Sequence, residues 1–100
     1  MIDFLIDFGI SNSTVESLKN NNSDSVLYSL KTNELEIEKI LNYFREIGIT
    51  DIDELLIHQM EVFFKTYREI KNVFSRYDLL QLVAFINDDI SNIGLLFKSN

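Results

Sequence analysis

The sequence predicts an all-α fold, arranged as a small helical-repeat, solenoid-like array of about six to seven short helices. Proline is absent and glycine occurs three times in 100 residues, so the tight turns of a β-sandwich are hard to build. Apolar residues make up 46% of the chain and recur at the three- and four-residue spacing of a helix face, which supplies one core. We therefore expect a single all-helical domain over residues 1–100.

The N-terminal third predicts three short helices. Residues 2–8 form a helix that Gly9 ends, because glycine accepts the left-handed conformation that often follows a helix. Ser11 caps the second helix. The run NNNSD, residues 20–24, predicts a surface loop before a short helical turn that ends near Leu30.

The central stretch, IEKILNYFREIGITDIDELL, carries the clearest helical pattern. Asn33 and Glu36 have the spacing of a capping box at the start of a long helix, and Gly48 ends that helix. Thr50 and Asp53 repeat the same cap spacing at the start of the next helix. The residues expected on the buried side of the long helix are Ile37, Ile40, Leu41, Phe44 and Ile47.

A short, strongly apolar segment over residues 58–65 follows. Thr66 and Glu69 then form the clearest capping box of the chain, and the helix that they begin is expected to run through Tyr77.

Two further helices are predicted at the C-terminal end. Residues 79–86, LLQLVAFI, are apolar nearly all round, so this helix is expected to be central in the fold. Residues 87–89 break it, and residues 90–97 form a last helix over the core. The tail from Lys98 is expected to fray.

The helix–glycine–helix pattern occurs twice. Residues 8–11, FGIS, match residues 47–50, IGIT, which makes Gly9 and Gly48 equivalent structural positions. A third copy without its glycine begins at residue 78. A helical unit of this kind cannot bury its own apolar face, so neighbouring units are expected to stack.

The run FREIGITDIDELLIHQMEVFFKT, followed by the capped helix REIKNVF, resembles the helical repeat of the mitochondrial transcription termination factor (mTERF) family. The junction of residues 48–50 and the pair Leu55 and Leu56 carry the likeness. The resemblance implies a curved solenoid that binds double-stranded nucleic acid along a basic concave face. The chain departs from the family pattern near Met60, where the family usually has a proline.

Charge is distributed unevenly along the chain, whose net charge is −7. Residues 1–64 contain twelve acidic and four basic side chains, and this acidity disfavours broad nucleic-acid binding. A basic stretch follows, and its cations fall opposite the apolar stripe of their predicted helix: Lys65, Arg68, Lys71 and Arg76. We interpret them as a candidate docking patch for an acidic partner or for phosphates; a plain solvated helix face is the alternative.

No catalytic constellation is present. Glu54 lies four residues before His58, a spacing that suits a proton shuttle or half a metal site, but one histidine completes no ligand set. Asp51, Asp53 and Glu54 suit acid–base chemistry or binding, although carboxylates at a helix start also complement the helix dipole. The sequence therefore predicts no enzyme, no cofactor and no metal site.

The expected compartment is the cytoplasm, in a bacterium or phage. There is no cysteine, no apolar run of about 20 residues, and no early Lys or Arg of a signal peptide. The expected function is a non-enzymatic interaction domain that binds a protein partner, as an inhibitor or regulatory adaptor, with the acidic face of residues 33–61 against a basic surface. The alternative is an mTERF-like nucleic-acid-binding protein that uses residues 65–76.

Overall fold

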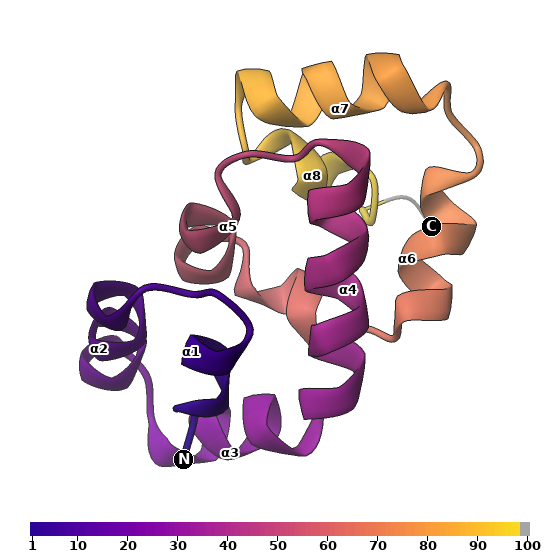
Figure 1. The fold of residues 1–100 in the computed structure, drawn as a ribbon. Coiled ribbons are helices and arrows are strands. Elements are labelled where there is room, and N and C mark those ends of the chain that lie inside the picture. The colour runs from indigo at the N-terminus through magenta and orange to yellow at the C-terminus, as the bar shows by residue number, and fades with distance from the viewer. Residues whose placement is uncertain (99–100) are drawn as a thin grey trace.

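Eight α-helices and one 3-10 helix make up residues 1–98, the part of the chain that the computed structural model describes (Figure 1). They are α1 (Phe4–Asp7), α2 (Asn12–Asn21), α3 (Asp24–Thr32), α4 (Glu34–Ile47), α5 (Ile52–His58), η1 (Met60–Phe64), α6 (Tyr67–Phe74), α7 (Leu79–Asp88) and α8 (Asn92–Leu95). The all-α prediction is confirmed, with no strand in this range. Most of the tail whose fraying was expected, residues 99–100, lies outside the described residues.

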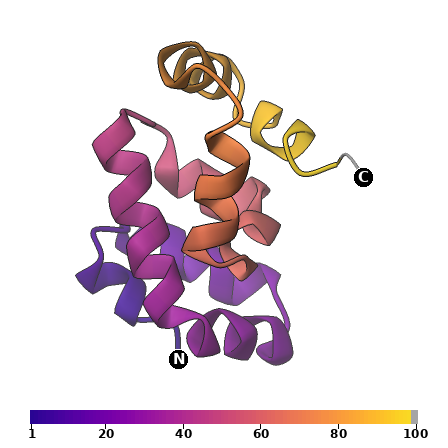
Figure 2. The same ribbon diagram turned by 90° about the vertical axis from the view of Figure 1, so that its right-hand side faces the viewer.

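The helices follow one another as three groups, namely α1–α3, then α4, α5 and η1, then α6–α8. The first group lies at one end of the molecule and α7 lies at the other, as both views show (Figures 1 and 2). The radius of gyration is 13.1 Å, close to the ~13 Å expected for a globular chain of 100 residues. The three groups therefore form a compact helical array.

Helix α4 carries the centre of the core. Four of its five predicted inward residues are fully buried, and Ile47 is partly buried. Phe44 stacks on Phe74 of α6 at 5.8 Å between ring centroids and meets Phe63 of η1 edge-on at 5.9 Å. The predicted buried side of the long helix is thus confirmed, and this helix ties α3, η1 and α6 together.

Both predicted glycine junctions adopt the same helix-ending geometry. Gly9 and Gly48 have φ angles of +90° and +101°, in the left-handed region. The residue after each glycine donates back to the preceding helix, from Ile10 N to Leu5 O at 3.0 Å and from Ile49 N to the carbonyl of Phe44 at 2.9 Å. This is the Schellman pattern, in which two backbone bonds satisfy carbonyls at the helix end.

The predicted loop over residues 20–24 is largely helical, and only Asn22 and Ser23 separate α2 from α3. The asparagine side chains extend α2 because they donate to its last carbonyls. Asn21 Nδ2 lies 2.8 Å from Ser17 O, and Asn22 Nδ2 lies 3.0 Å from Leu18 O. Ser23 then caps α3, since its hydroxyl accepts from Val26 N.

Helix α7 is peripheral, which overturns the prediction that residues 79–86 are central. Leu82 and Ile86 are its buried residues, whereas Leu80 is 85% exposed. The helix before it also ends earlier than expected, at Phe74, and leaves Tyr77 exposed. An all-round apolar pattern predicts burial only where other elements cover the helix on every side.

Two of the three predicted capping boxes do not form. Only Thr66 and Glu69 exchange both bonds of the box, at 3.1 and 2.8 Å. Asn33 instead donates to the carbonyl oxygens of Phe63 and Lys65, at 2.7 and 3.2 Å. The residue that precedes α4 therefore ties the start of this helix to the end of η1 and to the segment that leads into α6.

The Thr50–Asp53 pair is separated in the same way. Thr50 N donates to Asn87 Oδ1 at 3.1 Å, and Asp53 Oδ2 accepts from Ser11 N at 3.0 Å and from Thr14 Oγ1 at 2.8 Å. Asn87 also donates to the carbonyl of Gly48 at 3.0 Å. Each glycine junction is thus bound by a side chain of the helical group that follows it.

Candidate functional site

The most unusual surface feature is apolar and lies on and just before α7. Tyr77, Leu79, Leu80 and Phe85 are 46%, 40%, 85% and 43% exposed, and we call these four side chains the α7 surface. Other exposed apolar residues are spread singly over different elements. Soluble monomers rarely leave large apolar side chains grouped in water, so this group is a candidate interaction site.

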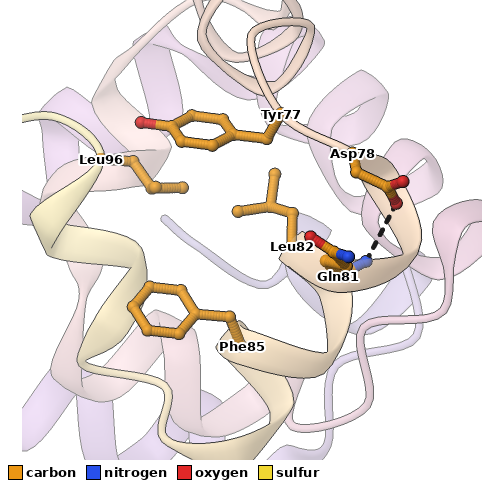
Figure 3. A pocket seen from close by; sticks show the side chains of 6 residues that line it. All are labelled: Tyr77, Asp78, Gln81, Leu82, Phe85 and Leu96. Carbon is orange, nitrogen blue, oxygen red and sulfur yellow. Dashed lines mark hydrogen bonds between the residues drawn. The ribbon is translucent and has the colours of Figure 1, made fainter.

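A groove of about 300 Å³ opens on one side of the α7 surface (Figure 3). Tyr77 and Phe85 stand on either side of it, with Leu82 at its base and Leu96 opposite. Its polar rim is fixed by the helix start, where Gln81 N donates to Asp78 Oδ1 at 3.2 Å. The groove is therefore lined mostly by apolar side chains and would suit an apolar side chain of a partner.

The predicted basic residues of α6 are only partly brought together. Arg68 and Lys71 lie on its exposed side, and neither forms an ion pair within residues 1–98. Lys71 Nζ lies 5.5 Å from the ring centroid of Tyr43 and 5.6 Å from that of Tyr67, a cation–π arrangement. Burial raises the pKa of Tyr43 despite the opposing charge of Lys71.

Lys65 and Arg76 lie on either side of α6 in the sequence and face different surroundings. Lys65 Nζ lies 4.9 Å from the ring centroid of Phe97, beside a second cavity of about 440 Å³ between η1 and the C-terminal segment. Arg76 is exposed, directly before Tyr77. The four cations of the basic stretch thus have different surroundings, and Arg76 alone borders the α7 surface in the sequence.

Of the three predicted carboxylates, Asp53 is hydrogen-bonded within the fold, whereas Asp51 and Glu54 are exposed. Burial acts to raise the pKa of Asp53, but its hydrogen bonds from Ser11 and Thr14, helped by Arg45, hold the pKa below its usual value. Asp51 begins α5 without a side-chain cap bond and is exposed. Asp53 is thus occupied inside the fold, whereas Asp51 and Glu54 remain on the surface.

His58 and Glu54 form an exposed contact, with Nε2 and Oε1 3.3 Å apart. Both side chains are more than half exposed, so water screens the pair. Within the described residues, no three His, Asp or Glu side chains are grouped so that they could hold a metal ion. The pair is therefore a surface contact that water screens.

Sequence reasoning missed the α7 surface because it assigned the same residues to the core. The run LLQLVAFI contains no charged residue, so the sequence does not mark which side of this helix is exposed.

Among residues 1–98, no helix combines the length and apolar character needed to cross a membrane. The chain matches no protein-family model, no curated protein and no solved structure.

Proposed function

We propose that this chain is a non-enzymatic helical interaction domain that binds a protein partner through the α7 surface. In this proposal it works in the cytoplasm of a bacterium or in a phage-infected cell, as an inhibitor or a regulatory adaptor. The observation that carries the proposal is the 85% exposure of Leu80, in a helix whose residues 79–86 are all apolar except Gln81.

The exposed apolar area of the α7 surface favours a protein partner. Covering apolar surface contributes roughly 25 cal/mol per Å², and a protein partner supplies apolar side chains where a nucleic-acid backbone supplies phosphates. Tyr77 and Phe85 add aromatic side chains of the kind that anchor protein interfaces. Net charge of −7 adds long-range repulsion against phosphate backbones.

The acidic face of residues 33–61 suits an inhibitor that approaches a basic partner. Asp51 and Glu54 are exposed and available for such a contact, whereas Asp53 is held by Ser11 and Thr14. Acidic side chains of this kind raise the association rate more than the affinity. In this proposal they steer the partner, and the α7 surface holds it.

Partner capture from a host lysate tests the proposal. Leu80→Ser and Phe85→Ser are expected to reduce recovery of the captured proteins at least about tenfold, because each removes an apolar anchor. Leu35→Ser is the matched control, since Leu35 is 72% exposed on α4 and isolated from the α7 surface. Equal recovery by wild type, Leu80→Ser and Leu35→Ser would contradict the proposal.

A nucleic-acid-binding role of the mTERF-like kind is the alternative. It is favoured by the exposed cations Arg68, Lys71 and Arg76, which form no ion pair within the described residues. Titration of duplex DNA and RNA at several salt concentrations separates the two functions. Binding that weakens with salt and disappears in Arg68→Glu, but persists in Leu80→Ser, supports the alternative; no binding at low salt removes it.

A further inference from the structure

We propose that the protein partner of the α7 surface presents a basic amphipathic helix. The apolar side chains of that helix cover Leu80 and enter the groove beside Phe85, and its cations meet the carboxylates at the two ends of α7. This inference rests on the proposed function, because it names the chemical class of the partner for the same surface. Three observations lead to it: the form of the apolar side of α7, the net charge around this helix, and the position of one carboxylate.

The exposed side of α7 has a form that a helix of a partner can cover. At about 100° per residue, Leu80 and Phe85 lie on the two flanks of this side, and the small exposed Ala84 lies between them. The groove of about 300 Å³ opens on the Phe85 flank (Figure 3). An amphipathic helix places apolar anchors at every third or fourth position, so it reaches both flanks at once.

The surroundings of this apolar side are acidic. Three carboxylates and one cation lie on α7 or close to its ends, for a net charge of −2: Asp78, Asp88, Asp89 and Arg76. Residues 90–97, which include Leu96 on the other side of the groove, contain no charged side chain. A partner that covers the α7 surface is therefore attracted if it is basic and repelled if it is acidic. A second copy of this chain would bring the same negative charge and is disfavoured.

Asp88 has a position that the fold itself does not explain. It is the last residue of α7, where the helix dipole disfavours a negative charge. It is exposed, and within residues 1–98 its carboxylate forms no ion pair. The neighbouring Asp89 differs, because its carboxylate accepts from the amide and the hydroxyl of Ser91. A cation of a partner would offset the unfavourable charge of Asp88.

The spacing of the carboxylates sets the spacing of the partner's cations. Asp78 and Asp88 stand at the two ends of a helix that rises about 1.5 Å per residue, so their backbones lie about 15 Å apart. Asp78 accepts the cap bond from Gln81 through Oδ1, and its side chain is exposed to a further donor. A partner helix that packs along α7 therefore needs cations about ten residues apart, one at each end of its apolar stripe.

Binding of designed peptides tests the partner class. The probe is a peptide of about 18 residues with a Leu stripe at helical spacing and Lys residues about ten positions apart. One control peptide has Glu in place of each Lys, and the other has Ser in place of each Leu. In fluorescence anisotropy we expect a dissociation constant of about 1–100 μM for the probe, and binding at least about tenfold weaker for both controls. Absence of binding by the probe overturns the inference, and so does a control that binds as tightly.

Apolar variants of the protein test whether the probe binds at α7. Phe85→Ser and Leu80→Ser are expected to weaken its binding at least about tenfold, because each removes an apolar anchor. Leu35→Ser, on the exposed side of α4, is the matched control and should bind as wild type does. Equal binding by all three variants would place the probe elsewhere and overturn the inference.

Charge variants test the contact with Asp88. Asp88→Lys should weaken binding of the probe about threefold to tenfold at low salt, and the helix dipole favours this lysine, so the fold is not at risk. Glu38→Lys changes the net charge equally, but exposed Glu38 lies about 15 Å along α4 from Gly48, where that helix meets Asn87 of α7. We expect this control to weaken binding less than about twofold. Equal weakening by the two variants overturns the predicted contact.

Sedimentation of the wild type alone tests the other occupant of the surface. The chain is expected to stay at 11.7 kDa up to ~1 mM. A dimer that Leu80→Ser dissociates would overturn the inference and make a second copy the partner.

Failure of this inference is distinguishable from failure of the proposed function. If no probe binds but Leu80→Ser still loses the proteins captured from a lysate, the partner class is wrong and the function stands. If Leu80→Ser captures the same proteins as wild type, the proposed function falls, and this inference falls with it.

Discussion

The carboxylate of Asp53 accepts a hydrogen bond from the hydroxyl of Thr14 at 2.8 Å, across 39 residues of sequence. The same oxygen accepts from the backbone of Ser11 at 3.0 Å, so one side chain of α5 holds both the start of α2 and the junction before it. Thr14 is the buried polar side chain of the described core. Burying it is affordable only because this bond satisfies its hydroxyl.

Replacing Asp53 by Ala should destabilise the fold by about 1–3 kcal/mol, because Thr14 and the Ser11 amide both lose their acceptor. Asp51→Ala is the matched control, since Asp51 is exposed and its side chain makes no cap bond. We expect that control to stay within about 0.5 kcal/mol of wild type in urea unfolding. Equal losses in the two variants would show that the link between α2 and α5 contributes nothing.

Stability should fall as the solution is acidified below about pH 4. Against the effect of burial, hydrogen bonds lower the pKa of Asp53, and the Thr66 backbone amide lowers the pKa of Glu69. A carboxylate whose pKa is lower in the folded state contributes stability above its unfolded pKa, and this is lost as pH falls through the folded pKa. Asp53→Asn should therefore show a shallower acid dependence of the unfolding midpoint than wild type, and identical profiles would refute this role.

The substitution Asn33→Asp tests whether Asn33 acts mainly as a helix cap or as a hydrogen-bond donor to the end of η1 and to Lys65. Asparagine and aspartate cap helices about equally well, so a pure cap would tolerate the change. The Asn33 amide, however, donates to the carbonyls of Phe63 and Lys65, and a carboxylate has no proton to donate. We expect Asn33→Asp to cost about 1–3 kcal/mol. The exposed Asn42→Asp serves as control, and a wild-type melting temperature for Asn33→Asp would restore the capping interpretation.

Gly48→Val should cost more stability than any substitution of an exposed side chain. A Cβ at Gly48 would lie 3.7 Å from Val83 Cγ1, an ordinary contact, so the cost comes from the φ angle of +101°. A residue with a Cβ loses roughly 1–2 kcal/mol there, and a β-branched one loses more. Gly48→Asn, which tolerates the left-handed region better, should lose clearly less in thermal unfolding. A Val variant that melts like wild type would mean that this glycine is not needed for the turn.

Local sequence patterns predicted correctly those helix features that depend only on residues within about one helical turn. The left-handed glycines, the Thr66 cap and the buried stripe of α4 follow from residue type and spacing, because each depends on neighbours within about five positions. The surroundings of the candidate binding residues could not be read from local patterns. Asp53 is bonded to Ser11 and Thr14, and the cations of the basic stretch have different surroundings, so binding by these residues stays a prediction.

The sequence by itself determined that this chain is all-helical, where its two glycine turns lie, and which side of α4 is buried. Only the tertiary structure decided which groups the polar cap residues hydrogen-bond and which apolar helix is exposed at the surface. Asn33, Thr50 and Asp53 each have a local partner at the right spacing, yet each bonds to a segment at least 30 residues away. Helix α7 has an apolar pattern typical of a core helix, yet it lies at one end of the described fold and leaves Leu80 exposed. Hydrogen-bond partners and burial depend on what packs alongside, and periodicity along one segment carries no information about that.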